Sequence, residues 1–196
     1  MQKRVKTRSY VTHNTINLAI PTPAHRQQVE TFKTQFLKTE PHIDGGGNLG
    51  VLEFDQWLQQ VADHRQGKNL PDGYTPSTLF LAIRESDNKM VGVIQIRHDL
   101  IPPWKDIGGH IGYSTAPDER GKGYATEMLR LALPKCAELG LHEVWLTCVP
   151  ENAASAKVIT NNGGMFMGTS IVPQFDTVPS HYVGKTLHRY RIAIPI

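Results

Sequence analysis

The chain has 196 residues, of which 39% are hydrophobic and 20% are charged, and its formal net charge is +3. These values are ordinary for a soluble globular protein, and such a mild charge without a long basic stripe argues against a nucleic-acid partner. No apolar run approaches the roughly 20 residues of a membrane span, and the N-terminal segment is too polar for a secretory signal. We therefore expect a cytoplasmic protein that binds neither nucleic acid nor membrane.

The two cysteines, Cys136 and Cys148, lack the spacing of a metal site or a disulfide framework. We expect a reducing compartment and no metal cofactor. Residues 1–14 contain several basic side chains, and we interpret them as a flexible tail in front of one domain over residues 15–196.

The first part of the domain predicts a strand and two helices. Residues 16–20 are typical of a short strand, and apolar side chains recur at helical spacing through residues 23–39 and again from residue 54 until Gly67. The glycine-rich segment 41–50 between the helices is expected to be a loop.

The middle of the chain predicts a meander of three strands. Residues 78–85 and 90–98 flank a short turn and favour a hairpin, and residues 110–116 follow as a further strand. We expect the intervening segment 100–109 to be a loop.

The last part alternates helices and strands. A helical stripe ends at Gly140, and the elements after it are strand 143–149, a short helix within 151–162, and closing strands 165–172 and 187–194. This order predicts a mixed α/β sheet rather than a doubly wound one.

The stretch "PDERGKGYATEMLRLAL" places two glycines where a helix must begin. The first turn of a helix offers free N–H groups and the positive end of the helix dipole. Gly121 and Gly123 would let an anion approach this backbone closely, and Arg120 and Lys122 add positive charge. The segment predicts a phosphate-binding turn made of backbone amides.

Two familiar phosphate-binding motifs do not fit this turn. The P-loop pattern G-x-x-x-x-G-K-[ST] is absent, and the dinucleotide fingerprint G-x-G-x-x-G has Thr126 in place of its third glycine. The acidic residue expected on the ribose would be Glu143, which begins a strand rather than ending one.

The turn fits the pattern R-x-x-G-x-A, with Arg120, Gly123 and Ala125, and here the sequence resembles the GNAT superfamily of acyl-CoA-dependent N-acetyltransferases. The resemblance extends in order from Thr78 to Phe166. The stretches "DGGGNLG" and "GGHIGYSTAPDERGKGYATEMLRLA" look like a little-characterised bacterial branch of predicted acetyltransferases. The resemblance implies a mostly antiparallel sheet of about seven strands, splayed between the fourth and fifth, with about four flanking helices.

The resemblance also assigns cofactor-binding roles. The backbone from Gly121 to Thr126 would hold the pyrophosphate of acetyl-CoA, and pantetheine would lie between strands 110–116 and 143–149, pairing with the first strand. The residues implied in cofactor binding are Ser114, Thr115, Ala116, Arg120, Gly121, Lys122, Gly123, Tyr124, Ala125, Thr126, Asn152, Ser155 and Lys157. Asn152 can instead cap its own helix, and Lys157 can be a plain surface lysine.

Amide formation requires a donor for the oxyanion, and the departing thiolate either receives a proton or electrostatic support or leaves unaided. A backbone N–H near Thr115 is the natural oxyanion donor. Many family members carry a tyrosine acid seven residues after the asparagine, but Ile159 occupies that position here. Other candidates for the acid are Tyr113, Cys148 and Tyr182, each of which also has a plain structural interpretation.

The acceptor amine must also lose a proton. For this base we favour His110, whose unperturbed pKa of about 6.5 suits the task, although a strand-edge histidine can be purely structural. Glu53, Asp55 and Asp44 are alternatives in the region that commonly borders the acceptor site in this family.

The favoured function is transfer of an acetyl group from acetyl-CoA to a primary amine of a small molecule or peptide, in a protein that can form a homodimer. Two alternatives remain at this point. Ile159 favours an acyl-CoA-binding module with little turnover, and the glycines alone suit a nucleotide-binding oxidoreductase.

Overall fold

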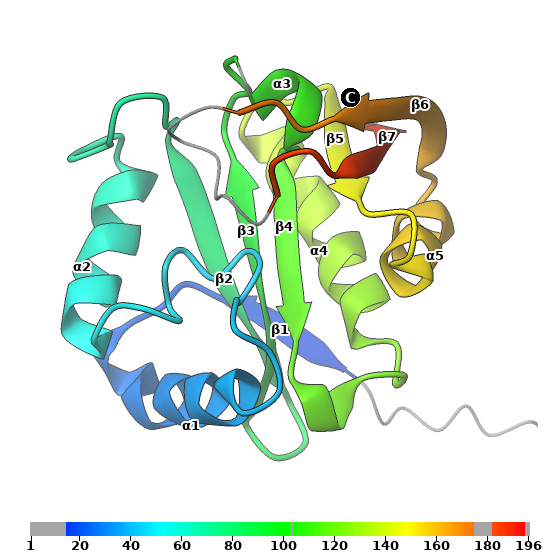
Figure 1. Cartoon of the computed structure of the whole chain (residues 1–196). Helices are drawn as coiled ribbons and strands as arrows, with labels where there is room; N and C mark the ends of the chain where they lie inside the picture. The colour runs from blue at the N-terminus through cyan, green and yellow to red at the C-terminus, as the bar shows by residue number, and fades with distance from the viewer. Residues whose placement is uncertain (1–14, 103, 175–181, 195–196) are drawn as a thin grey trace, which may run out of the picture.

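A computed structural model describes residues 15–102, 104–174 and 182–194. The basic tail expected over residues 1–14 lies outside them. Figure 1 shows the arrangement of the helices and strands.

The first sheet is antiparallel, with strand order β1-β2-β3-β4. Its strands are β1 (Ile16–Ala19), β2 (Ser77–Arg84), β3 (Lys89–Arg97) and β4 (Ile111–Thr115). The predicted strand at the start of the domain and the predicted meander are therefore confirmed.

The second sheet is also antiparallel and has the order β5-β7-β6. Its strands are β5 (Glu143–Cys148), β6 (Met165–Ile171) and β7 (Thr186–Ala193). These strands confirm the three that were predicted for the last part of the chain.

Five α-helices accompany the strands in the described residues. They are α1 (Arg26–Leu37), α2 (Phe54–Arg65), α3 (Trp104–Ile107), α4 (Tyr124–Glu138) and α5 (Ala153–Asn161). Helix α3 lies in the segment that the sequence predicted as a loop. One helical turn is too short to show a hydrophobic period, so the pattern could not reveal it.

The side chains of the first sheet pack into two cores, one on each face. Helices α1 and α2 cover one face, where Trp57, Phe32 and Leu81 are buried. Helix α4 covers the other face, where Met128 and Ile94 are buried together with side chains of the second sheet. Figure 1 shows α1 and α2 on the side of the first sheet away from α4.

The two sheets meet at the beginning of β4. The His110 N–H donates to the carbonyl oxygen of Trp145 on β5 at 2.7 Å. A Cβ atom on Gly109 would lie 2.6 Å from that same oxygen, so this close approach requires glycine. Beyond this point β4 and β5 belong to separate sheets. The predicted splay between the fourth and fifth strands is confirmed.

Candidate active site at the splayed strands

The glycine turn before α4 adopts backbone conformations that favour glycine. Gly121 has φ +75° and Gly123, the N-cap of α4, has φ +88°. A Cβ atom built on either residue meets no atom within 4 Å. The space beside this backbone is therefore open, as a turn that admits a ligand requires.

The amides of the first turn of α4 point out of the helix without intrahelical acceptors, as in any α-helix. The first intrahelical hydrogen bond is donated by the Glu127 N–H to the carbonyl oxygen of Gly123 at 3.1 Å, so the N–H groups before Glu127 have no acceptor within the helix. The Tyr124 ring is buried, and its hydroxyl accepts a hydrogen bond from Arg84 Nη1 at 3.0 Å. This anchoring fixes the start of the helix, and with it the direction of its amides.

The buried carboxylate of Glu119 connects the glycine turn to the neighbouring strands. Glu119 is only 3% exposed and accepts hydrogen bonds from Arg84, Lys89 and Lys122 at 2.7–2.8 Å. Burial alone would raise the pKa of Glu119, but these three hydrogen bonds outweigh burial and lower the pKa to about 2. Glu119 thus remains ionised and ties β2 and β3 to the glycine turn.

Arg120 forms an ion pair with Glu40, and its guanidinium lies over the ring of Phe36. Lys122 is paired with Glu119. Because both cations of the turn already have carboxylate partners, its backbone amides are the groups best placed to receive an anion.

The edge of β4 that faces β5 has no neighbouring strand. The Ala116 N–H donates to the carbonyl oxygen of Val91, and the carbonyl oxygen of His110 accepts from the Arg97 N–H. Alternate residues along β4 therefore bond to β3 through their backbone. By that alternation the peptide groups of Tyr113 and Thr115 face away from β3. Thr115 Oγ1 is buried and has no partner among the described residues. A backbone edge and an unsatisfied hydroxyl thus lie side by side.

Tyr113 connects β4 to α5 across the splay. Its hydroxyl lies 2.8 Å from Ser155 Oγ. Burial raises the pKa of Tyr113 to about 12, so the phenol remains protonated at neutral pH. The Cys148 thiol is buried nearby, and burial also raises its pKa, which keeps it from being a thiolate.

At the start of α5, Asn152 caps the helix through Oδ1, which accepts the Ser155 N–H at 2.9 Å. Lys157 is exposed. Ile159, at the position where the family often has a tyrosine, is fully buried in the core. A tyrosine at 159 in this chain would therefore have to displace core side chains.

His110 is 93% buried, and its Nδ1 accepts the Trp145 N–H at 3.0 Å. That lone pair is occupied, so a neutral ring carries its proton on Nε2. Burial lowers the pKa of His110. The geometry thus gives His110 a structural task at the junction of the two sheets.

The glycine-rich loop 41–50 lies over β4. A Cβ atom on Gly45 would lie 2.1 Å from the carbonyl oxygen of Gly112, so the two backbones approach as closely as glycines allow. Ser114 Oγ donates to the Asp44 carbonyl at 2.9 Å, and the Tyr182 hydroxyl donates to the Asp44 carboxylate at 3.0 Å. Asp44 and Tyr182, far apart in sequence, therefore meet beside β4.

Glu53 and Asp55 lie elsewhere. Glu53 is the exposed N-cap of α2, and Asp55 forms an ion pair with Arg26 on α1. Both residues thus belong to the layer formed by α1 and α2 rather than to the surroundings of β4. Of the four carboxylate and histidine candidates for the base, only Asp44 and His110 contact the region around β4.

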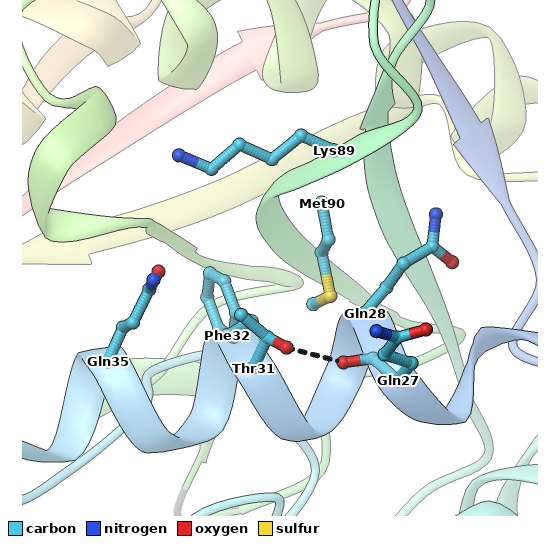
Figure 2. Close-up of a pocket in the computed structure, with 7 residues that line it drawn as sticks. All are labelled: Gln27, Gln28, Thr31, Phe32, Gln35, Lys89 and Met90. Carbon is cyan, nitrogen blue, oxygen red and sulfur yellow. Dashed lines mark hydrogen bonds between the residues drawn. The ribbon is translucent and has the colours of Figure 1, made fainter.

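The close-up in Figure 2 shows a shallow pocket between α1 and the start of β3. Polar side chains of α1 line it, and Lys89 at its edge is paired with Asp118 and Glu119. This pocket is separate from the splayed strands and its lining contains no carboxylate, so we assign it no role in catalysis.

The remaining findings concern metals and membranes. The residues described contain no cluster of histidine, cysteine or carboxylate side chains that could hold a metal ion. None of the described helices has the length and apolar character needed to cross a bilayer.

Sequence reasoning missed two features of the site. The role of Glu119 was not predicted, because acidic residues before a helix are common and only the fold brings three cations to this one. The Tyr113–Ser155 pair was not predicted either, because it joins residues 42 positions apart.

Comparison with known proteins was made by sequence and by structure. The family model of the acetyltransferase (GNAT) domain matches residues 21–165. No curated protein matches the sequence.

Solved structures share the fold at low identity. The ribosomal L7/L12 α-N-protein acetyltransferase RimL in complex with coenzyme A is 18% identical, with a TM-score of 0.65 and coverage of 92% of this chain and 94% of that one. The microcin C7 self-immunity acetyltransferase MccE, in complex with acetyl-CoA and AMP, is 15% identical, with a TM-score of 0.62 and coverage of 91% and 92%. A chimera of spermidine N-acetyltransferase SpeG from Vibrio cholerae and hSSAT is 16% identical, with a TM-score of 0.59 and coverage of 91% and 94%. Because the family model spans most of the chain and these structures share its fold, the chain belongs to the GNAT acetyltransferase family.

Proposed function

We propose that the protein transfers an acetyl group from acetyl-CoA to a primary amine. One observation carries this proposal: a turn with open glycine backbone precedes α4, and it follows directly on a strand edge that lacks a neighbouring strand. A diphosphate suits the first feature, and an extended amide-containing arm suits the second.

The residues present fit acetyl-CoA. The amides from Gly121 to Thr126 would hold the diphosphate, and the free edge of β4 would pair with the pantetheine amides. When bound, the cofactor supplies the acetyl group as a thioester. The unsatisfied Thr115 hydroxyl supports this fit, because the arm offers it a partner.

The chain can assist the chemistry from two sides of β4. The Thr115 N–H, which faces the gap, is a preorganised donor for an oxyanion. The Tyr113 hydroxyl, paired with Ser155, holds a proton near the same edge and can deliver it to a departing thiolate. The Tyr182 hydroxyl donates to the Asp44 carboxylate instead, so we assign Tyr182 to the acceptor side.

Asp44 is the strongest candidate to receive the acceptor's ammonium group or its proton. It sits in a loop fastened to β4 through Ser114, whereas the Nδ1 lone pair of His110 is already used by Trp145. Glu53 is tied to the helical layer and is the weakest of the candidates.

The similar structures support an amine as the acceptor, because they are named for acetylating a ribosomal protein and spermidine. A further similar structure, of spermidine N-acetyltransferase from Vibrio cholerae, is described as dodecameric. For this chain we propose a homodimer. The alternative, an acyl-CoA-binding module with little turnover, rests on the buried Ile159.

A thiol-release assay with acetyl-CoA and a panel of amines and short peptides tests the proposal. We expect acceptor-dependent release of coenzyme A, together with heat protection by coenzyme A but not by NAD. Tight coenzyme A binding without release from any acceptor would favour the binding module. Absence of coenzyme A binding would refute both.

A further inference from the structure

Arg97, the last residue of β3, makes contacts unlike those of the described arginines that pair with carboxylates. Five arginines form ion pairs with carboxylates: Arg26, Arg84, Arg120, Arg130 and Arg191. Arg97 has no such pair among the described residues. Its guanidinium donates through Nη1 to the carbonyl oxygen of Gly109 at 2.8 Å and lies 5.2 Å from the centre of the Trp104 ring.

Arg97 is half-buried as a residue, and its guanidinium is desolvated. Burial lowers the pKa of Arg97, although Tyr74 and Asp44 act in the opposite direction. A guanidinium has five N–H donors, and the described protein residues accept a hydrogen bond from one of its nitrogens. A desolvated cation without a carboxylate in direct contact is costly, so its retention points to a partner from outside the chain.

The side chain lies on the face of the sheet that the acceptor would approach. Side chains alternate along a strand, so Arg97 shares the face of Val93, which packs with α1 and α2. Loop 41–50 lies over the same face, as Figure 1 shows. The guanidinium lies over the Trp104 ring, and Tyr74 packs edge-on against Trp104.

The distance along the sheet limits the partner. The Arg97 N–H donates to the carbonyl oxygen of His110, which lies just before β4 and four residues before Ser114. Four residues of strand correspond to roughly 13 Å. The main chain of Asp44 lies at the Ser114 end. The backbones that carry the two charged side chains are thus attached at different points along one face, while Asp44 still raises the pKa of Arg97.

We propose that Arg97 binds an anionic group of the acceptor, a carboxylate or a phosphate, while the amine to be acetylated lies toward Asp44. The inference rests on the proposed acetyl transfer. A planar guanidinium suits either anion because it can donate two parallel hydrogen bonds. Because the two groups belong to backbone positions well apart along the sheet, we expect an acceptor whose amine and anion are separated by several bonds, rather than an α-amino acid that carries both on one carbon. The acceptor class is therefore an amine with a remote anionic group, such as a short peptide or an amino-alkyl phosphate.

The first experiment compares matched acceptors by kcat/KM. Glycine, diglycine and triglycine are each assayed beside their C-terminal amides, and aminopentyl phosphate is assayed beside pentylamine. We expect triglycine or aminopentyl phosphate to exceed its neutral counterpart at least tenfold, and the Arg97→Gln variant to lose this preference. Arg130→Gln, which removes an exposed arginine on α4, should keep it. A larger preference within the peptide pairs would identify a carboxylate as the bound anion, and a larger preference for aminopentyl phosphate over pentylamine would identify a phosphate.

The second experiment does not require turnover. The enzyme is saturated with coenzyme A, which occupies the diphosphate site, and is titrated calorimetrically with N-acetyltriglycine and with its amide. Tighter binding of the acid, by at least tenfold in the wild type and absent in Arg97→Gln, supports the proposal. Equal binding of acid and amide, or no measurable binding of either, overturns it, as does an equal preference in the variant. Failure of coenzyme A itself to bind would instead overturn the proposed function.

A folding control completes the test. Arg97→Met keeps the length of the side chain and removes its charge, and we expect its Tm to stay within about 3 °C of the wild type, because lost contacts and relieved desolvation oppose each other. A much larger fall in Tm, together with loss of coenzyme A affinity, would show that Arg97 is structural and would overturn the proposal.

Discussion

His110 and Trp145 hold each other through two hydrogen bonds: the His110 N–H donates to the Trp145 carbonyl at 2.7 Å, and the Trp145 N–H donates to His110 Nδ1 at 3.0 Å. The side chain of one strand thus replaces the backbone acceptor that an ordinary ladder would supply. The pair joins the sheets at one point, after which β4 and β5 diverge and leave the edge that the proposed cofactor needs.

Replacement of His110 by alanine should therefore destabilise the protein. It leaves the Trp145 N–H without its acceptor, at an expected cost of about 1–3 kcal/mol in the free energy of unfolding. Urea unfolding measures this cost. His110→Asn, which can still accept a hydrogen bond, should recover part of it. If alanine lowered turnover with unchanged stability, His110 would act as the base after all.

Stability should also depend on pH through this residue. Burial lowers the pKa of His110 below its usual 6.5 in the folded state, so the folded protein binds fewer protons than the unfolded chain. The contribution of His110 is complete above about pH 6.5 and is lost as the pH falls through the folded pKa. Unfolding free energies measured from pH 7.5 to 5 should fall, and the fall should be smaller in His110→Asn. Equal slopes would contradict this account.

Glu119 should be essential to the glycine turn. Glu119→Gln removes a buried charge that three cations share, so we expect a loss of about 1–3 kcal/mol in stability and at least tenfold weaker coenzyme A binding. Because its pKa is lowered to about 2, its stabilising effect is present above about pH 4.5 and is lost as the pH falls toward 2. Acid titration of both proteins, followed by circular dichroism, measures this difference. Identical acid unfolding would mean that the buried carboxylate is not coupled to folding.

Gly45→Ala should impair acetyl transfer while coenzyme A still binds. The new Cβ would lie 2.1 Å from the Gly112 oxygen, so loop 41–50 must move off β4 and take Asp44 with it. We expect KM for the acceptor to rise at least tenfold in steady-state kinetics. Gly50→Ala is a matched control in the same loop, because its Cβ meets only a side-chain atom at 3.6 Å. Equal effects of the two substitutions would argue against a role for the Gly45–Gly112 contact.

Tyr113→Phe should separate chemistry from binding. It removes the proton that Ser155 orients, so kcat should fall by about 10²-fold while coenzyme A affinity changes little. Tyr190→Phe removes a hydroxyl from another buried tyrosine, on β7, and should leave kcat near the wild-type value. A normal kcat in Tyr113→Phe would mean that another group protonates the thiolate, or that it leaves unprotonated.

The sequence was sufficient for the fold because its signals are local. Strand alternation, the helical stripe after Tyr124 and the glycines of the turn each depend on neighbouring residues, and together with the GNAT resemblance they predicted the order of the elements and the splay. The short α3 was the exception, since four residues contain too little periodicity.

The site was harder to predict because its contacts join distant residues. Nothing near His110 in the sequence reveals that Trp145 uses its Nδ1, and nothing near Asp44 reveals Tyr182. Likewise, Arg97 resembles any strand-end arginine until the fold shows that no described carboxylate pairs with it. The roles predicted for catalytic residues therefore stay predictions, whereas the positions of those residues are now known.

The most direct test of the account is calorimetric titration of coenzyme A into the wild type, Gly123→Glu and Gly140→Glu. Both glycines have positive φ, +88° and +80°, and neither Cβ would meet an atom within 4 Å, but they lie at opposite ends of α4. The account predicts that both variants fold, that Gly140→Glu binds as the wild type does, and that Gly123→Glu loses binding because its carboxylate meets the diphosphate. Unchanged affinity in a folded Gly123→Glu would contradict the central claim that the open backbone before α4 binds acetyl-CoA.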